Sequence, residues 1–386
     1  MLSVLPYQRL LKAPEQSFFL FGMRGVGKST WTRQAFPEAS HFDLLDEGLF
    51  QSYLRDSRLF GRELLQLPTA HTVVLDEVQR LPVLLNEVHR FIESRGLRFV
   101  LLGSSSRKLK SAGTNLLAGR ALRRVMYPFL PTELGPDFDL DKELRFGSLP
   151  VNWRSTNKAD SLEAYVQLYL KEEIQAEALV RNLPGFARFL PIAALFHGQT
   201  LNVAGLARDA GVARATVAGY LEILADTYLT WQLPAYDGKL RVKERKHPKL
   251  YWIDPGVVRA VRREFHVPTE SERGALFEGW IALLLKAYGE PGSGLGLRWD
   301  ALYYWASHGA EVDFLVQRGN EFTAIEVKAK DTLTSRDLKG LKAVADLKGL
   351  HRRVVVFLGE RPFRTEDGIE AMPVRYFLDE LESNRL

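Results

Sequence analysis

The residues from Gly22 to Ser29 have the types and spacing of a phosphate-binding loop. The stretch GMRGVGKS follows a short apolar run and matches G-x-x-x-x-G-K-[ST] at every fixed position. Glycines let backbone N–H groups turn toward a β-phosphate, the lysine ammonium reaches the β- and γ-phosphates, and the serine hydroxyl coordinates magnesium. We therefore predict binding of ATP and Mg²⁺. The predicted nucleotide-binding residues are Gly22, Arg24, Gly25, Val26, Gly27, Lys28, Ser29 and Thr30.

An apolar run that begins at His71 ends in the acidic pair Asp76 and Glu77. This pattern predicts a buried strand with two carboxylates at its carboxyl end. We expect Asp76, together with Ser29, to hold the magnesium ion, and Glu77 to polarise the attacking water. By itself, an acidic pair after an apolar run is a weak signal. Its distance from the Gly22–Ser29 loop is the length expected of intervening strand and helix units, and this strengthens the interpretation.

Two further groups of polar residues are candidates for a catalytic role. The strand predicted at Leu97–Gly103 runs into Ser104 and Ser105, either of which is placed to sense the γ-phosphate. Arg120, our first choice, and Arg123, our second, precede a strand predicted at Val125–Leu130. An arginine there could reach the γ-phosphate of a neighbouring subunit and couple hydrolysis to assembly. Plain surface arginines are the alternative.

The middle of the chain contains a helix-turn-helix pattern. Two helices are predicted, at Leu201–Ala210 and Ala213–Tyr228, with Gly211 in the turn. Two strands at Trp231–Tyr236 and Lys249–Asp254 would form a wing with the basic residues at its tip. The predicted DNA-contacting residues are Arg214, Thr216, Tyr220, Arg241, Lys243, Arg245 and Lys246. A winged helix used for protein contacts is the alternative.

Three residues near the C-terminus fit the D…E-x-K order of restriction-endonuclease-like nucleases. Asp313 begins a predicted strand, while Glu326 and Lys328 lie two residues apart on the next and therefore share a face. Helped by Glu278 on a preceding helix, the two carboxylates could bind Mg²⁺, and Lys328 could orient a water molecule. DNA cleavage, DNA contact without cleavage and a structural role remain open.

The Gly22–Ser29 loop, LDE at 75–77, LLGSSS at 101–106 and LLAGRA at 116–121 together resemble prokaryotic AAA-type ATPases. The chain is similar to the group in which a winged helix and a nuclease-like domain follow the ATPase. The resemblance implies an α/β fold with five parallel strands and helices on both faces. One departure is that no separate four-helix lid with a second sensor arginine is recognised. The implied domains are an ATPase at 1–135, a helical connector at 136–185, a winged helix at 186–266 and a restriction-endonuclease-like domain at 267–386.

Composition sets the remaining expectations. The 386 residues include no Cys, 46% are hydrophobic, and the formal net charge is +5. These values indicate a cytoplasmic protein without disulfides or a membrane partner. The leading hypothesis is a magnesium-dependent ATPase that remodels or translocates DNA, such as branched DNA, as a ring, with a hexamer favoured. The alternatives are an ATP-gated metal-dependent nuclease and a nucleotide-dependent signalling switch that binds a protein partner.

Overall fold

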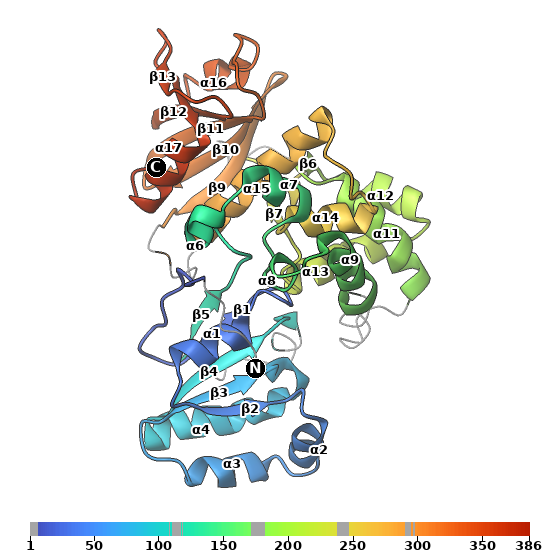
Figure 1. Ribbon diagram of the computed structural model, residues 1–386, viewed down its shortest axis with the longest axis vertical. Helices are drawn as coiled ribbons and strands as arrows, with labels where there is room; N and C mark the ends of the chain where they lie inside the picture. The colour runs from blue at the N-terminus through green and yellow to red at the C-terminus, as the bar shows by residue number, and fades with distance from the viewer. Residues whose placement is uncertain are drawn as a thin grey trace.

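A computed structural model describes residues 7–107, 109, 117, 119–170, 182–237, 247–289, 295 and 298–386. Figure 1 shows the N-terminal α/β unit, in blue and cyan, at one end of the molecule and the C-terminal sheet, in orange and red, at the other. The green and yellow helices of the middle residues lie between and beside them. In the described residues, no helix combines the length and the apolar character that crossing a membrane requires.

The N-terminal unit is built on a parallel sheet with strand order β2-β3-β4-β1-β5. Its strands are β1 (Phe18–Phe21), β2 (Ser40–Asp43), β3 (Thr72–Asp76), β4 (Arg98–Gly103) and β5 (Leu122–Val125). The helical elements are α1 (Lys28–Ala35), α2 (Glu47–Arg55), α3 (Arg58–Leu65), η1 (Val78–Arg80), η2 (Pro82–Leu84) and α4 (Leu85–Arg95). Alternate strand residues belong to two hydrophobic clusters, one with α1 and one with α2 to α4. Helices therefore cover both faces, as expected.

The last strand of this sheet was expected at Val125–Leu130, and that prediction is wrong. β5 ends at Val125, where the predicted strand was to begin. Pro128 lies in the predicted stretch and has no N–H group to donate to a strand ladder. The strand therefore begins two residues after Arg120, at Leu122, and includes Arg123.

The described part of the connector expected at 136–185 consists mainly of several short helices. Its elements, with their neighbours, are α6 (Pro131–Leu134), η4 (Gly135–Asp137), α7 (Leu140–Phe146), α8 (Pro150–Trp153), α9 (Lys158–Ala164) and the π-helix η5 (Tyr165–Leu170). Asp139 and Asn157 cap α7 and α9, since each side chain accepts a first-turn N–H group. The helices α7 and α8 are too short to show a helical period in the sequence.

The helix-turn-helix residues form two helices that are followed by a small sheet. The elements are α11 (Leu183–Leu195), β6 (Gln199–Thr200), α12 (Val203–Ala210), α13 (Arg214–Asp226), β7 (Thr230–Leu233), β8 (Lys249–Trp252) and α14 (Pro255–Arg262). Gly211 ends α12 with a φ of 63°, a left-handed conformation that favours glycine. β8 pairs antiparallel with both β6 and β7, so Lys249 lies in the central strand of this sheet.

The C-terminal unit is a six-stranded mixed sheet with the order β13-β14-β12-β11-β10-β9. Its elements are α15 (Glu270–Gly289), β9 (Ala301–Ser307), β10 (Ala310–Arg318), β11 (Glu321–Lys328), α16 (Lys339–Ala343), β12 (Leu350–Phe357), β13 (Phe363–Arg364), β14 (Glu370–Pro373) and α17 (Val374–Glu382). β9, β10 and β11 form an antiparallel meander, whereas β12 is parallel to β11 and to β14. This arrangement brings Asp313 on β10 beside Glu326 on β11.

Candidate functional site

The loop between β1 and α1 has the close packing that its glycines predict. A Cβ atom on Gly22 would lie 2.3 Å from the carbonyl oxygen of Met126, so no larger residue fits there. Gly27, at the N-cap of α1, has a φ of 91°. It has no side chain to cap the helix, so the first N–H groups of α1 are available to an anion. The Val26 side chain is fully buried, so only its backbone could contact a ligand.

The Lys28 side chain is buried within the loop. Its ammonium donates hydrogen bonds to the carbonyl oxygens of Gly22, at 2.7 Å, and of Met23, at 3.2 Å. Lys28 is only 6% exposed, and a buried ammonium needs such acceptors. Phosphate oxygens are stronger acceptors than carbonyl oxygens, so the loop's residues fit a nucleotide phosphate.

Ser29 and Asp76 lie together at the carboxyl ends of the parallel strands. The Ser29 hydroxyl donates to Asp76 Oδ2 over 2.5 Å, and the backbone N–H of Glu77 donates to Asp76 Oδ1 over 2.9 Å. Burial raises the pKa of the Asp76 carboxyl above its ordinary value, although the hydrogen bond from Ser29 opposes this. A hydroxyl beside a carboxylate is a donor set that suits Mg²⁺. Ser29 and Asp76 would hold the ion, which would supply charge neutralisation at the phosphates.

Glu77 forms a side-chain network with two other polar residues. Ser104 Oγ, at the end of β4, donates to Glu77 Oε2 over 3.2 Å. The amide of Gln79 donates both to Glu77 and, over 3.0 Å, to Ser104 Oγ. By contrast, the Ser105 hydroxyl accepts the N–H of Arg107 in a local turn. Ser104, rather than Ser105, therefore lies next to Glu77.

Gln79 is a candidate site residue that sequence reasoning missed. It is 2% exposed, and its Oε1 atom has no hydrogen-bond partner among the described residues. Glu77 has a φ of 54°, which is unusual for a residue other than glycine and turns the chain sharply into η1. This turn brings Gln79 back toward Glu77. The sequence signal that could have identified Gln79 is its position two residues after Glu77.

The remaining predicted nucleotide-site residues lie around this centre. The carbonyl oxygen of Arg24 accepts a hydrogen bond from the Tyr165 hydroxyl at 2.9 Å, so the connector contacts the loop. Thr30 lies half-buried in the first turn of α1. Arg120 forms an ion pair with Glu93 on α4, and its side chain is 40% exposed. The Arg123 guanidinium lies 5.8 Å from the ring centroid of Tyr228.

The segment after Ser104 contacts α13. The backbone N–H of Ser106 donates to the carbonyl oxygen of Asp226 over 3.0 Å, and Arg107 lies 3.5 Å from the Asp226 carboxylate. Nearby, the rings of Phe21 on β1 and Tyr228 stack at 5.7 Å. The residues that follow the Glu77 network therefore pack on the end of the second helix of the helix-turn-helix.

The candidate DNA-contacting residues fall into three classes. Arg214 is exposed and Thr216 half-buried at the start of α13. Tyr220 was expected to contact DNA, and this prediction is wrong. Its ring is 4% exposed and packs against Phe186 and Phe189, while its hydroxyl donates to the Asn182 carbonyl oxygen. The remaining four, Arg241, Lys243, Arg245 and Lys246, lie outside the described residues.

The predicted acidic residues of the C-terminal unit do come together. Glu326 and Lys328 lie on one face of β11, with Lys328 Nζ 2.5 Å from Glu326 Oε1. Asp313 Oδ2 accepts the N–H of Val327 over 2.9 Å. Burial raises the pKa of Glu326 to about 8 and that of Glu278 to about 7, and in both the charge of Asp313 adds to the effect.

Lys249, the first residue of a strand of the predicted wing, lies within this group. Lys249 Nζ is 3.0 Å from Glu278, 2.6 Å from Glu311 and 3.6 Å from Asp313. The Tyr251 hydroxyl donates to the same Glu278 oxygen over 2.6 Å. Burial alone would lower the pKa of Lys249, but the surrounding carboxylates raise it above its ordinary value.

The prediction that Glu278, Asp313 and Glu326 form a magnesium site needs correction. Within the described part of the chain, no three acidic or histidine side chains are arranged to hold a metal ion. The physical reason lies in the contacts above, since the ammonium of Lys249 contacts Glu278 and Asp313, and that of Lys328 contacts Glu326. As they lie, these residues do not fit the ion.

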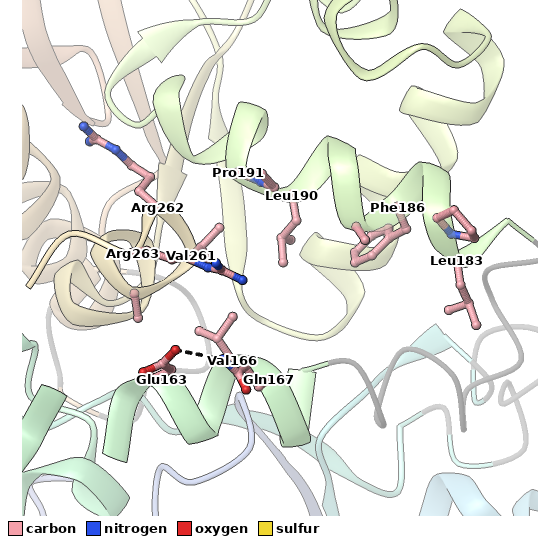
Figure 2. Close-up of a pocket in the computed structure, with 13 residues that line it drawn as sticks. Glu163, Val166, Gln167, Leu183, Phe186, Leu190, Pro191, Val261, Arg262 and Arg263 are labelled. Atoms are coloured by element: carbon pink, nitrogen blue, oxygen red, sulfur yellow. Dashed lines mark hydrogen bonds between the residues drawn. The ribbon is translucent and has the colours of Figure 1, made fainter. Parts of the chain in front are cut away.

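A separate apolar cavity of about 570 Å³ lies in the middle of the molecule. Figure 2 shows it between α11 and the segment of α9 and η5 that carries Glu163, Val166 and Gln167. Arg262, the last residue of α14, and Arg263, which follows it, lie at one end. Phe186 and Leu190 line the opposite wall. None of the residues that we predicted from the sequence lines this cavity.

Family models cover most of the chain in three parts. Residues 14–135 match an AAA domain, whereas residues 137–266 and 273–377 match two domains of unknown function, DUF8612 and DUF4143. The chain is 26% identical over 372 residues to uncharacterized protein Rv2008c of Mycobacterium tuberculosis and uncharacterized protein Mb2031c of Mycobacterium bovis. The alignment covers 93% of this chain and 80% of each relative.

Solved structures give weaker similarities. The replication initiator DnaA, bound to AMPPCP and single-stranded DNA, is 13% identical with a TM-score of 0.27, over 56% of this chain and 83% of that one. Protein VC1899 from Vibrio cholerae is 14% identical with a TM-score of 0.21, over 96% of both chains. TM-scores of this size carry no argument about a shared fold. The AAA family match, the parallel sheet and the Gly22–Ser29 loop show instead that residues 14–135 form an AAA-type P-loop ATPase domain.

Proposed function

We propose that the chain is a magnesium-dependent ATPase that binds DNA and couples ATP hydrolysis to DNA remodelling or translocation as an oligomeric ring. In this proposal Lys28 and the loop N–H groups bind the phosphates, and Ser29 and Asp76 hold the magnesium ion. Glu77 accepts the proton of the attacking water, and Ser104 and Gln79 keep the Glu77 carboxylate in place. The α11–β8 region acts as a winged helix, with Arg214 and Thr216 facing DNA.

One observation carries the coupling: a continuous path from Glu77 to α13. Ser104 contacts Glu77, and two residues later Ser106 and Arg107 contact Asp226 at the end of α13. A change at the Glu77 carboxylate during hydrolysis would shift Ser104, and the short segment after it would transmit that shift. Such coupling requires a segment with two arrangements, which we assign to residues 104–107.

The ATPase assignment is tested by comparing wild type with Lys28→Ala and Glu77→Gln. We expect Lys28→Ala to lose nucleotide affinity, because the loop then lacks the buried ammonium that meets the phosphates. Glu77→Gln should retain ATP but slow its hydrolysis by about 10²-fold or more, the loss expected for a general base. Measured phosphate release that is unchanged in both variants would show that the site has been mislocated.

The coupling is tested by adding duplex DNA to the same assay. We expect DNA to stimulate wild-type hydrolysis, and Asp226→Ala to lose most of this stimulation while it keeps the basal rate. The matched control is Asp209→Ala, which changes an exposed acidic residue on α12 and should behave as wild type.

The salt dependence of duplex binding tests whether the chain contacts DNA phosphates. DNA binding that does not weaken as salt is added would argue against phosphate contacts and favour a protein partner.

A second candidate function, metal-dependent DNA cleavage, is favoured by the grouping of Asp313, Glu326 and Lys328. Because these residues do not fit a metal ion as they lie, we assign none of them a step in cleavage. The test is incubation of supercoiled plasmid with Mg²⁺ or Mn²⁺. Equal nicking by wild type and Asp313→Ala would remove this candidate.

A further inference from the structure

Two groups of the connector donate hydrogen bonds to carbonyl oxygens of the Gly22–Ser29 loop. The hydroxyl of Tyr165, the first residue of η5, donates to the Arg24 carbonyl oxygen over 2.9 Å. The backbone N–H of Val151, in α8, donates to the Gly25 carbonyl oxygen over 3.3 Å. Two consecutive peptide groups of the loop are therefore held by elements that follow the whole ATPase domain in the sequence.

The two hydrogen bonds set the direction of the N–H group in each of these peptides. In a trans peptide the C=O and N–H bonds point in opposite directions. The carbonyl group of Arg24 shares its peptide with the N–H of Gly25, and the carbonyl group of Gly25 shares its peptide with the N–H of Val26. The N–H of Gly25 has no hydrogen-bond partner among the residues that the structure describes. It is therefore available to a phosphate oxygen.

Both donors are fixed by close packing. The Tyr165 side chain is buried, with 3% of the residue exposed. A Cβ atom on Gly25 would lie 2.8 Å from Cγ1 of Val151, so α8 lies directly against the loop. Shortly before α8, the Ser148 N–H donates to Asp254 Oδ2 over 2.9 Å, and the same carboxylate caps α14. A group that orients another group must itself be held in this way.

We infer that Tyr165, together with the N–H of Val151, positions the loop for the phosphates of the nucleotide. The Tyr165 hydroxyl holds the Arg24 carbonyl so that the Gly25 N–H faces the phosphates, and the loop needs less ordering when the nucleotide binds. An N–H group that donates to an anion also makes the carbonyl of its own peptide a better acceptor, so the phosphate strengthens the contact with Tyr165. In this role Tyr165 acts through the loop and does not touch the nucleotide. The inference rests on the ATP-binding part of the proposed function.

The experiment compares the full chain with its variant Tyr165→Phe, which keeps the buried ring and removes only the hydroxyl. Dissociation constants are measured with Mg²⁺ by displacement of a fluorescent ADP, and the competitors are ATP and inorganic tripolyphosphate. We expect Tyr165→Phe to bind both competitors about three- to tenfold more weakly than wild type, the scale of one hydrogen bond. Because the effect acts on groups that bind phosphate, the factor should be the same for the two competitors.

The matched control is Tyr53→Phe, which removes another buried tyrosine hydroxyl of the ATPase domain. Tyr53 is 1% exposed, and its hydroxyl donates to Glu63 Oε2 over 2.6 Å. Thermal unfolding without nucleotide gives the second readout. Both variants should melt below wild type, since each loses a buried hydrogen bond, but only Tyr165→Phe should bind the competitors more weakly.

Three results would overturn the inference and leave ATP binding standing. The first is a Tyr165→Phe protein that binds both competitors as tightly as wild type. The second is weaker binding of ATP alone, which would place Tyr165 beside the adenosine part of the nucleotide. The third is an equal loss of affinity in Tyr53→Phe, which would indicate a general effect of stability. Failure of wild type to bind either competitor would overturn this inference and the proposed ATPase together.

Discussion

At the scale of single residues, the ATPase site depends on how the Glu77 carboxylate is oriented. A general base works only when its oxygen lies within hydrogen-bond reach of the water that it activates. Glu77 leaves β3 with a left-handed backbone, and without other contacts its side chain would sample several rotamers. Ser104 and Gln79 restrict it by binding the same oxygen, Oε2. Neither Ser104 nor Gln79 binds the other oxygen, Oε1, in these two contacts.

We predict that Gln79→Ala slows ATP hydrolysis without weakening ATP binding. The variant frees the Glu77 carboxylate to rotate, and a misplacement of about 1 Å can cost on the order of 10²-fold in rate. Steady-state phosphate release and the affinity for a fluorescent nucleotide would separate the two effects. Gln66→Ala changes an exposed glutamine of the same domain and should be silent. A Gln79→Ala enzyme with an unchanged kcat would exclude this positioning role.

The sequence could predict that certain site residues lie close together because they stand at the ends of parallel strands. Asp76 and Ser104 follow apolar runs, and the carboxyl ends of parallel strands meet at one edge of the sheet. The contacts of Lys249 were not predicted, because they cross to α15 and β10 and no local pattern reveals such pairs. Tyr220 was assigned to DNA although it shares the helical spacing of the buried residues Val217 and Leu224. The helical periodicity of α13 therefore predicts that Tyr220 is buried.

At the scale of elements, a buried acid joins the connector to the C-terminal unit. Glu143 on α7 is 1% exposed, and its carboxylate accepts a hydrogen bond from the indole N–H of Trp280 on α15. Its other oxygen, Oε1, has no partner among the described residues. Burial raises the pKa of Glu143 from 4.5 to about 8, although the hydrogen bond from Trp280 opposes this. The folded protein thus holds a proton on Glu143 that the unfolded chain loses near pH 4.5.

We predict that the α7–α15 contact weakens in alkali, because Glu143 then loses this proton. The contribution of protonated Glu143 to the stability of the folded protein is complete below pH 4.5. It is lost progressively as pH rises through the folded-state pKa of about 8. Glu143→Gln keeps an acceptor for Trp280 and cannot ionise. Its melting temperature should therefore match that of wild type near about pH 5 and exceed it near about pH 9. Parallel Tm curves for the two proteins across this range would contradict the prediction.

At the scale of the whole molecule, the proposed ring requires one subunit to complete the site of the next. Arg120 lies on the ATPase domain with its side chain 40% exposed, and its partner Glu93 is itself 55% exposed. An exposed ion pair contributes little stability, so a neighbouring phosphate could replace the Glu93 carboxylate at small cost. Head-to-tail contacts of this kind close into a ring when the rotation between subunits allows it.

We predict that Arg120→Ala and Lys28→Ala, each inactive alone, restore one another when mixed. An Arg120→Ala subunit keeps its phosphate loop, and a Lys28→Ala neighbour supplies the arginine. With equal amounts and random assembly, about a quarter of the subunit contacts combine both functions, so about a quarter of wild-type hydrolysis should return. Arg62→Ala, which removes another exposed arginine, is the control and should stay active. A mixture no more active than its two components would mean that Arg120 acts within its own chain or not at all, and the same assay with Arg123→Ala would then test the second arginine.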